Sequence, residues 1–208
     1  MKTSRIIIVI GLLAFVAVLY YSMRGGESLE DYARELQKER EEKDVMMKSG
    51  DDSPFAKSTD PFTGLNYFPP DLKYRITADL VPIESKKTLS LPTSDGKVKH
   101  YQEYAYAEFN LDGVFNRLLI LEIIDSGPYR GTLFLAFADE TSAAETYGAG
   151  RYLEVKKTPG ASTITLDFNR AYNPYCAYSD AFSCPFPPRE NILKVAIKAG
   201  EKNYKELD

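Results

Sequence analysis

Polar side chains that could bind a small molecule are concentrated in the second half of the 208-residue chain. The candidate ligand-binding residues lie at the ends of predicted strands or in a long loop, and they are Glu145, Tyr147, Arg151, Asp167, Asn169, Tyr172 and Asn173. Arg151 offers a fork of N–H donors that suits a carboxylate or a phosphate. Asp167 or Glu145 would orient that fork, and the tyrosines would form the pocket wall. The same residue types also suit a purely structural role, as a buried Arg–Asp pair and as asparagines that stabilise turns.

Catalysis is the first alternative to binding. An enzyme of unknown reaction would have its site at four of the same residues: Arg151, Asp167, Asn169 and Tyr172. Asp139 and Glu145 could act as general acid and base, but their spacing carries no signature. Residues 146–151 lack the Lys-Ser/Thr pair and the following helix of a phosphate-binding loop. We interpret them as a glycine turn that leads into a strand.

The two cysteines, Cys176 and Cys184, are eight positions apart in a Pro-rich loop. Outside the cytoplasm a disulfide is the expected state of such a pair, and it would stabilise the fold by about 2–3 kcal/mol. A metal site would need more ligands than two thiols and the distant His100. A thiol nucleophile would need a base, and nothing local places His100 near either cysteine. We favour the disulfide over these sites and over a free buried pair, and predict no metal and no cofactor.

Composition and charge exclude several classes of protein. The hydrophobic fraction of 44% and charged fraction of 27% are normal for a globular protein and exclude a wholly disordered chain. Residues 61–208 carry 17 basic and 19 acidic side chains. No segment forms the basic patch that neutralising nucleic-acid phosphates requires, so we predict no nucleic-acid partner.

The N-terminal segment predicts a membrane partner. Residues 6–21 are uncharged, and as a helix they would cover about 24 Å, slightly less than a ~30 Å hydrocarbon core. Lys2 and Arg5 precede this run, and an acidic segment follows it. This pattern predicts a transmembrane signal anchor over 1–24, with the N-terminus inside and the C-terminal domain outside the cytoplasm, either periplasmic or extracellular. A cleaved signal peptide is the alternative.

Residues 25–52 are predicted to form a helical stalk. Ser28 to Asp31 resemble a capping box, and a helix follows over 29–48. Its apolar stripe lapses at Glu39, Arg40 and Lys43 and resumes at Val45. Glu39 and Lys43 are also spaced to pair with each other along the helix surface. We interpret the lapse as a stalk whose far end docks on the domain.

Residues 53–208 are predicted to be one mainly β domain. Strand-like runs separated by turn residues fall at about 73–82, 87–91, 97–111, 114–124, 131–138, 151–156, 162–168 and 192–198. About eight strands with no helix between them favour an antiparallel up-and-down barrel or a sandwich. A barrel of this size can enclose one small ligand. The aromatic, Pro-rich loop between Phe168 and Leu193 is expected to be ordered and to cover one end of it.

Several stretches together resemble the bacterial domain-of-unknown-function family 1684. The most specific are Gly-Arg-Tyr-Leu at residues 150–153 and Asp-Phe-Asn-Arg-Ala-Tyr-Asn-Pro at residues 167–174. The resemblance extends over roughly residues 40–202. It implies an uncharacterised protein and provides no catalytic residues. One departure is Ala143, which follows Thr141-Ser142 where the resemblance leads us to expect a glycine.

The sequence therefore predicts a membrane-anchored, extracytoplasmic β domain. Its leading functional interpretation is binding of a small polar or anionic ligand in a loop-covered pocket. The alternatives are the enzyme described above and an envelope domain for protein interaction or structure, which would need no such pocket.

Overall fold

The computed structural model describes Phe15, residues 28–56 and residues 62–205. Apart from Phe15, the predicted anchor over 1–24 lies outside the described residues. Within the described ranges, no helix has the length and apolar character needed to span a bilayer.

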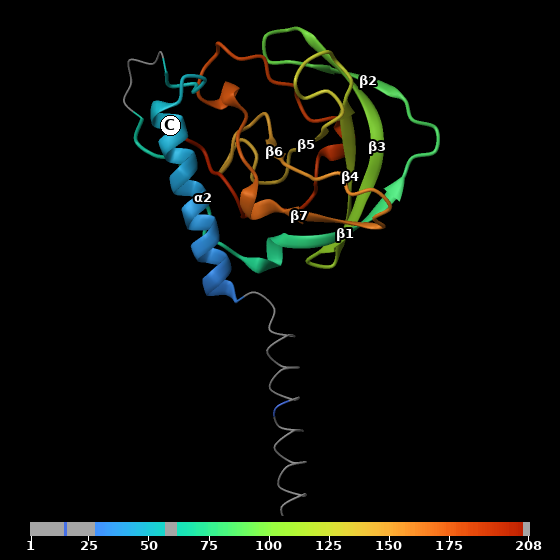
Figure 1. Ribbon diagram of the computed structural model, residues 1–208, viewed down its shortest axis with the longest axis horizontal. Coiled ribbons are helices and arrows are strands. Elements are labelled where there is room, and N and C mark those ends of the chain that lie inside the picture. Colours follow the sequence, from blue (N-terminus) through green and yellow to red (C-terminus); the bar gives the residue numbers. More distant parts are fainter. Residues whose placement is uncertain (1–14, 16–27, 57–61, 206–208) are drawn as a thin grey trace, which may run out of the picture.

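Helix α2 (Leu29–Ser49) matches the predicted helix, but it is not a stalk. Its cap forms as expected, with the Asp31 amide donating to the Ser28 hydroxyl (3.1 Å). Tyr32, Leu36 and Met47 are all buried, at 0–1% exposure, so the helix is docked from its first turn to its last. Figure 1 shows α2 lying beside the β domain rather than projecting from it. We predicted a stalk whose far end docks on the domain, whereas the helix is docked along its whole length.

The β domain is built on one antiparallel sheet of seven strands within the described residues. The strands are β1 (Arg75–Pro82), β2 (Thr88–Pro92), β3 (Val98–Leu111), β4 (Val114–Ile123), β5 (Leu133–Phe137), β6 (Arg151–Leu153) and β7 (Thr163–Asp167). Their order is β6-β5-β4-β3-β1-β7, with β2 beside the first part of β3. Because β6 and β7 are the two edges, the sheet is an open half-barrel, and neither the closed barrel nor the sandwich that we predicted is present.

Turn chemistry and a bulge shape this sheet. Asp112 and Gly113, at φ 54° and 79°, make the tight β3–β4 hairpin that the sequence predicts. The register of β3 against β4 shifts between Glu103 and Ala105. Before this bulge β3 pairs with β2, and after it β3 pairs with β1, so one long strand serves two neighbours on the same side.

The predicted strand over 192–198 is an extended segment that belongs to no strand of the sheet. Leu193, Val195 and Ile197 are buried in the main core and alternate with less buried residues, so the segment has the period of a strand. The backbone carbonyl of Ile197 accepts a hydrogen bond from the guanidinium of Arg151 instead of from a neighbouring strand. Residues just beyond β5 provide its other hydrogen bonds, since the Leu193 amide donates to the Ala138 carbonyl (2.8 Å) and the Val195 carbonyl accepts from the Glu140 amide (3.2 Å).

Short 3₁₀ helices and an asparagine complete the domain. The helices are η1 (Leu72–Tyr74), η2 (Phe168–Arg170), η3 (Tyr175–Ala177) and η4 (Arg189–Asn191). The buried amide of Asn191 accepts from the Leu119 amide (2.7 Å) and donates to the carbonyls of Leu119 (2.9 Å) and Ala136 (2.8 Å). It joins β4 to β5 beyond the short stretch where these strands pair directly. The main core lies on one face of the sheet, under η2 and the 193–199 segment.

Candidate functional site

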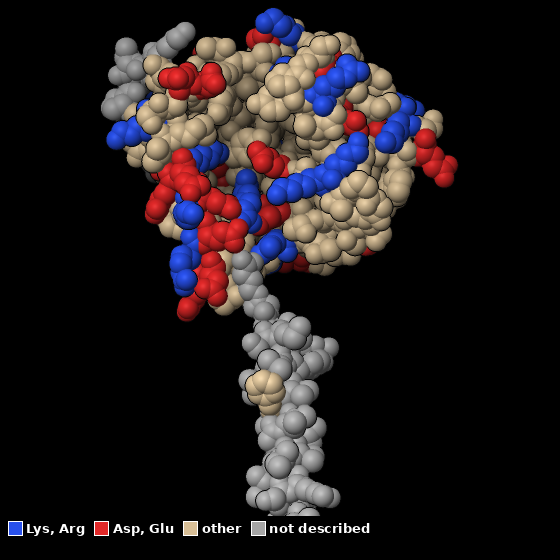
Figure 2. All heavy atoms as spheres, viewed as in Figure 1, with Lys and Arg blue, Asp and Glu red and all other residues tan. Residues whose placement is uncertain are grey.

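A cleft of about 880 Å³ lies between α2, the β6 edge of the half-barrel and the loop that follows η2. Leu36, Arg40 and Lys43 of α2 line one side. Tyr152 of β6 and Tyr172 of the loop line the other. Figure 2 shows this face of the molecule, where charged side chains gather along α2 and the surface is hollowed beside it.

Arg40 and Tyr67 form the cationic end of the cleft. The Arg40 guanidinium carbon lies 4.4 Å from the centre of the Tyr67 ring. Nε and Nη2 of Arg40 and the hydroxyl of Tyr67 are buried and have no hydrogen-bond partner in the part of the chain that the structure describes. Burial lowers the pKa of Arg40, and burial together with nearby carboxylates raises the pKa of Tyr67 far above its usual value.

Lys43 lies one helical turn beyond Arg40. Its Nζ is 2.9 Å from Oε2 of Glu201 and 4.8 Å from the centre of the Tyr172 ring. Glu201 is fully buried, and its side chain also accepts hydrogen bonds from the Asn173 amide (3.2 Å) and from the Tyr178 hydroxyl. Burial raises the pKa of Glu201, while the charge of Lys43 opposes that shift. The positive charge of Lys43 is thus paired, whereas Arg40 keeps unsatisfied donors.

Four aromatic rings continue from Lys43 along the cleft. The ring centres of Tyr172 and Tyr152 are 5.9 Å apart, those of Tyr152 and Phe134 5.0 Å, and those of Phe134 and Tyr101 4.9 Å. All four rings line the cleft. Tyr152 is held in place because its hydroxyl donates to the Pro185 carbonyl (2.6 Å). Burial raises the pKa of Tyr172 to about 12, so its hydroxyl stays protonated at neutral pH. We call Tyr101, Phe134, Tyr152 and Tyr172 the aromatic wall.

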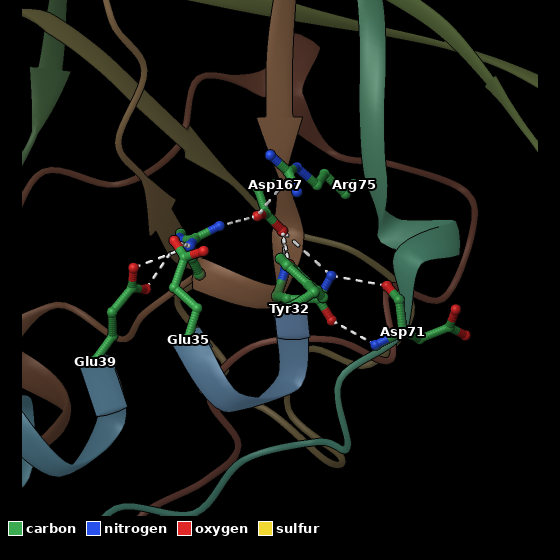
Figure 3. A network of polar contacts seen from close by, with 8 residues as sticks. Tyr32, Glu35, Glu39, Asp71, Arg75 and Asp167 are labelled. Carbon is green, nitrogen blue, oxygen red and sulfur yellow. Dashed lines mark hydrogen bonds and ion pairs between the residues drawn. The ribbon is translucent and has the colours of Figure 1, made fainter. Parts of the chain in front are cut away.

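Asp167 is the centre of a polar network that fastens α2 to the sheet (Figure 3). Its carboxylate accepts from the Tyr32 hydroxyl (2.6 Å) and from the side chain of Asn169 (3.2 Å), and it forms an ion pair with Arg170. Arg170 reaches two acidic residues of α2, at 2.6 Å from Glu35 and 2.8 Å from Glu39. These hydrogen bonds and ion pairs occupy Asp167 and Arg170, so we assign the network to positioning the helix.

Arg151 does not line the cleft, contrary to our prediction. It is fully buried, and Nη2 donates to Asp139 Oδ2 (2.8 Å) and to the Ile197 carbonyl (2.9 Å). Nη1 donates to the carbonyls of Ala199 and Glu201. Only Nε of this side chain lacks a partner within the described residues. Its location fits the structural alternative, a buried Arg–Asp pair that joins β6 to the C-terminal segment.

The remaining predicted site residues are divided between the cleft and its surroundings. Asp167, Asn169 and Tyr172 line the cleft. Glu145 forms an ion pair with Lys198 (2.8 Å) at the surface. The Tyr147 hydroxyl reaches the Cys176 carbonyl (3.5 Å), and the Asn173 side chain donates to the Lys202 carbonyl (2.8 Å). Neither Glu145, Tyr147 nor Asn173 belongs to the cleft lining.

The loop cysteines are joined by the disulfide that we favoured from the sequence. Cys176 and Cys184 are bonded, with their Cα atoms 6.1 Å apart. The bridge holds the Pro-rich segment over the aromatic wall, and Cys184 itself lines the cleft. Within the described ranges, no three His, Cys, Asp or Glu side chains converge as a metal site would require. His100 lies at the surface beside Asp125 (3.4 Å).

Sequence reasoning missed Arg40, Lys43 and Tyr67. The signal for the first two was present, because the apolar stripe of α2 lapses at these positions. We interpreted the lapse as part of a stalk whose far end docks on the domain, whereas in the structure it marks polar groups that face a cleft. Tyr67 lies in an irregular segment before η1, and such a segment has no periodic pattern from which the direction of a side chain could be predicted.

One comparison with known proteins gives a family, and none gives an activity. The family model described as "Protein of unknown function (DUF1684)" matches residues 60–202. A solved solution structure of an uncharacterised protein from Haloarcula marismortui is 39% identical, covers 83% of this chain and 95% of its own, and has a TM-score of 0.61. No curated protein matches the chain.

Proposed function

We propose that this chain, which belongs to the DUF1684 family of proteins of unknown function, binds a small organic anion in the cleft beside α2. The volume of about 880 Å³ lies within the range of about 300–1,000 Å³ that is usual for small-molecule sites. The cleft combines an aromatic wall with charged side chains of both signs, which are Arg40, Lys43, Lys99, Arg170, Glu39, Glu154 and Asp167.

One observation carries the proposal. Two nitrogens of Arg40 and the hydroxyl of Tyr67 are buried at the cleft without a hydrogen-bond partner among the described residues. Leaving a buried donor unsatisfied costs about 1–3 kcal/mol, and more for a charged group. A carboxylate or phosphate would accept from Arg40 in the forked geometry that guanidinium groups favour, and from the Tyr67 hydroxyl. Binding would remove that cost and neutralise a desolvated charge.

We also propose that the domain lies outside the cytoplasm, attached to a membrane through residues 1–24. The uncharged run at 6–21 supports the attachment. The Cys176–Cys184 disulfide supports the compartment, because such bonds persist in oxidising surroundings.

The enzyme alternative has lost support. It required Arg151 beside Asp167 and Tyr172, but Arg151 donates to Asp139 and to backbone carbonyls away from the cleft. The other alternative is a domain for protein interaction that binds no small molecule, and the experiment below distinguishes it from the proposal.

Native mass spectrometry of the full chain, gently purified from its own host, tests the proposal. We expect an excess mass that disappears on denaturation. Arg40→Gln should weaken retention about 10–100-fold, since hydrogen bonds to a charged group contribute about 1.5–3 kcal/mol. Arg34→Gln is the matched control, because Arg34 lies on the same helix but points into solvent. A bare wild-type mass, together with no uptake of acetate or inorganic phosphate, would contradict the proposal and favour an interaction domain.

A further inference from the structure

We infer that the anion bound at Arg40 carries a flat ring, which lies against the aromatic wall. This inference rests on the proposed function and adds the class of ligand, namely an aryl carboxylate or aryl phosphate. It is carried by the continuity between the cationic end of the cleft and the aromatic wall.

That continuity can be followed contact by contact. Arg40 and Lys43 are three residues apart on α2, so they lie on the same face of the helix. The ammonium group of Lys43 lies over the Tyr172 ring at 4.8 Å. From Tyr172 the rings of Tyr152 and Phe134 follow at centre-to-centre distances of 5.9 and 5.0 Å. A molecule whose acidic group reaches Arg40 would therefore have its body beside these rings.

A second group of rings in the same domain differs from the aromatic wall because it has no contact with the cleft. Phe109, Phe137 and Phe168 pack together at 5.8 and 5.2 Å and are 0–5% exposed. None of the three lines the cleft. Phe134 and Tyr152, by contrast, remain partly exposed within the described structure and face the cleft. The domain thus keeps one set of rings away from the cleft and leaves Phe134 and Tyr152 partly exposed in it, whereas Tyr101 of the aromatic wall is buried in a smaller core cluster.

The chemistry of the wall favours a ring over a chain. Aromatic side chains attract other rings through offset and edge-to-face contacts, beyond the burial of apolar area. Phe134 and Tyr152 already meet edge to face at 76°, and Tyr152 and Tyr172 at 82°, so adjoining ring faces point in different directions. A planar body could contact one face and the edge of the next ring at once, which a flexible chain does less well.

Ligand-observed NMR with the full chain measures how much the acidic group and the ring each contribute to affinity. Benzoate and phenyl phosphate combine the anion with the ring, and the two identify which acidic group is preferred. Inorganic phosphate has no ring, benzyl alcohol has no charge, and cyclohexanecarboxylate has a ring that is not flat. We expect phenyl phosphate to bind at least tenfold more tightly than inorganic phosphate, and benzoate about threefold more tightly than cyclohexanecarboxylate.

Matched variants locate the effect. Phe134→Leu should weaken binding of the preferred aryl anion about fivefold, and binding of inorganic phosphate less, because that ion has no ring. Phe115→Leu is the control, because Phe115 is 60% exposed and lies outside the cleft lining. An equal loss in both variants would overturn the inference.

The probes also distinguish failure of the inference from failure of the proposed function. If inorganic phosphate binds in an Arg40-dependent way but the flat ring adds nothing, the ring inference is overturned and anion binding stands. If cyclohexanecarboxylate equals benzoate, the wall recognises apolar area only, and the inference also falls. If no anion binds, both the ring inference and the proposed anion-binding function are overturned.

Discussion

Two arginines with desolvated guanidinium groups lie in this protein, and they differ in what surrounds them. Arg151 is enclosed by Asp139 and by the backbone carbonyls of the C-terminal segment. Arg40 stacks over Tyr67 at the edge of an open cleft and keeps two nitrogens without a partner among the described residues. Burial lowers the pKa of both, and nearby groups oppose that shift in each case, chiefly Asp139 at Arg151 and Tyr67 at Arg40. Arg151 has only its Nε without a partner among the described residues, and it does not line the cleft. The comparison teaches that a buried arginine indicates a ligand where most of its donors are unsatisfied and the side chain lines a cleft.

The largest expected effect belongs to Arg151. Arg151→Leu would leave Asp139 buried without its cation and would remove the donors that hold the C-terminal segment. We expect a loss of about 3–5 kcal/mol in the free energy of unfolding, the usual result of breaking a buried ion pair from one side. Urea denaturation followed by circular dichroism measures it. A variant that keeps wild-type stability but loses anion binding would reverse the comparison between the two arginines.

The disulfide tests how far the cleft depends on its loop. Replacing both Cys176 and Cys184 with serine should lower the free energy of unfolding by about 2–3 kcal/mol, because the unfolded chain is no longer constrained. The loop also carries Pro185, whose carbonyl positions Tyr152, so affinity for the aryl anion should fall severalfold. Thermal unfolding and binding measured on the same preparation separate the two effects. Unchanged stability with unchanged binding would show that the loop is held by packing alone.

Glu201 connects the two regions and should give the smallest effect, a change in pH dependence. Its carbonyl accepts from Arg151, and its carboxylate pairs with Lys43. A carboxyl whose pKa is raised in the folded state stabilises the fold below its ordinary pKa, and that stabilisation is lost as pH rises through the folded pKa. Relative to wild type, Glu201→Gln should therefore gain stability as the pH rises from about 4 to about 8.

Urea midpoints at several pH values across that range test the Glu201 prediction. If the wild type instead gains stability relative to Glu201→Gln as the pH rises, the charge of Lys43 lowers the pKa of Glu201 more than burial raises it. Glu103→Gln serves as a control, since Glu103 is more exposed and its contact is a hydrogen bond from the Lys87 amide.

Most of the secondary structure could be predicted from local patterns. The capping box at Ser28 and the Asp112-Gly113 turn have direct physical signatures, and both appear as expected. Even the departure at Ala143 has a structural counterpart, because this residue has φ 62°, in the region that a glycine adopts without strain. The extended segment over 192–198 was mistaken for a strand, since alternate burial does not reveal what accepts or donates the backbone hydrogen bonds.

The candidate site could be predicted only in part, because it depends on contacts between distant segments. Asp167, Asn169 and Tyr172 were found from their residue types beside a long loop. Arg151 was chosen for its chemistry, but no local pattern shows that the carbonyl of Ile197, 46 residues away, would meet it. Glu39 and Lys43 were expected to pair along the helix, yet docking of α2 gives Glu39 to Arg170 and Lys43 to Glu201. Tertiary contacts outweigh helix-surface pairs of a few tenths of a kcal/mol.

The placement of Arg40 and Lys43 on α2 has a consequence for how this scaffold can diversify. The family model begins at residue 60, so it contains the aromatic wall but neither cationic side chain. In the proposed site, the charge that recognises the acidic group would come from α2, with only the Tyr67 hydroxyl added by the β domain, whereas recognition of the ring would belong to the β domain alone. Exchanging a single turn of that helix would alter which charge the cleft accepts while the core that Arg151 holds together stays untouched.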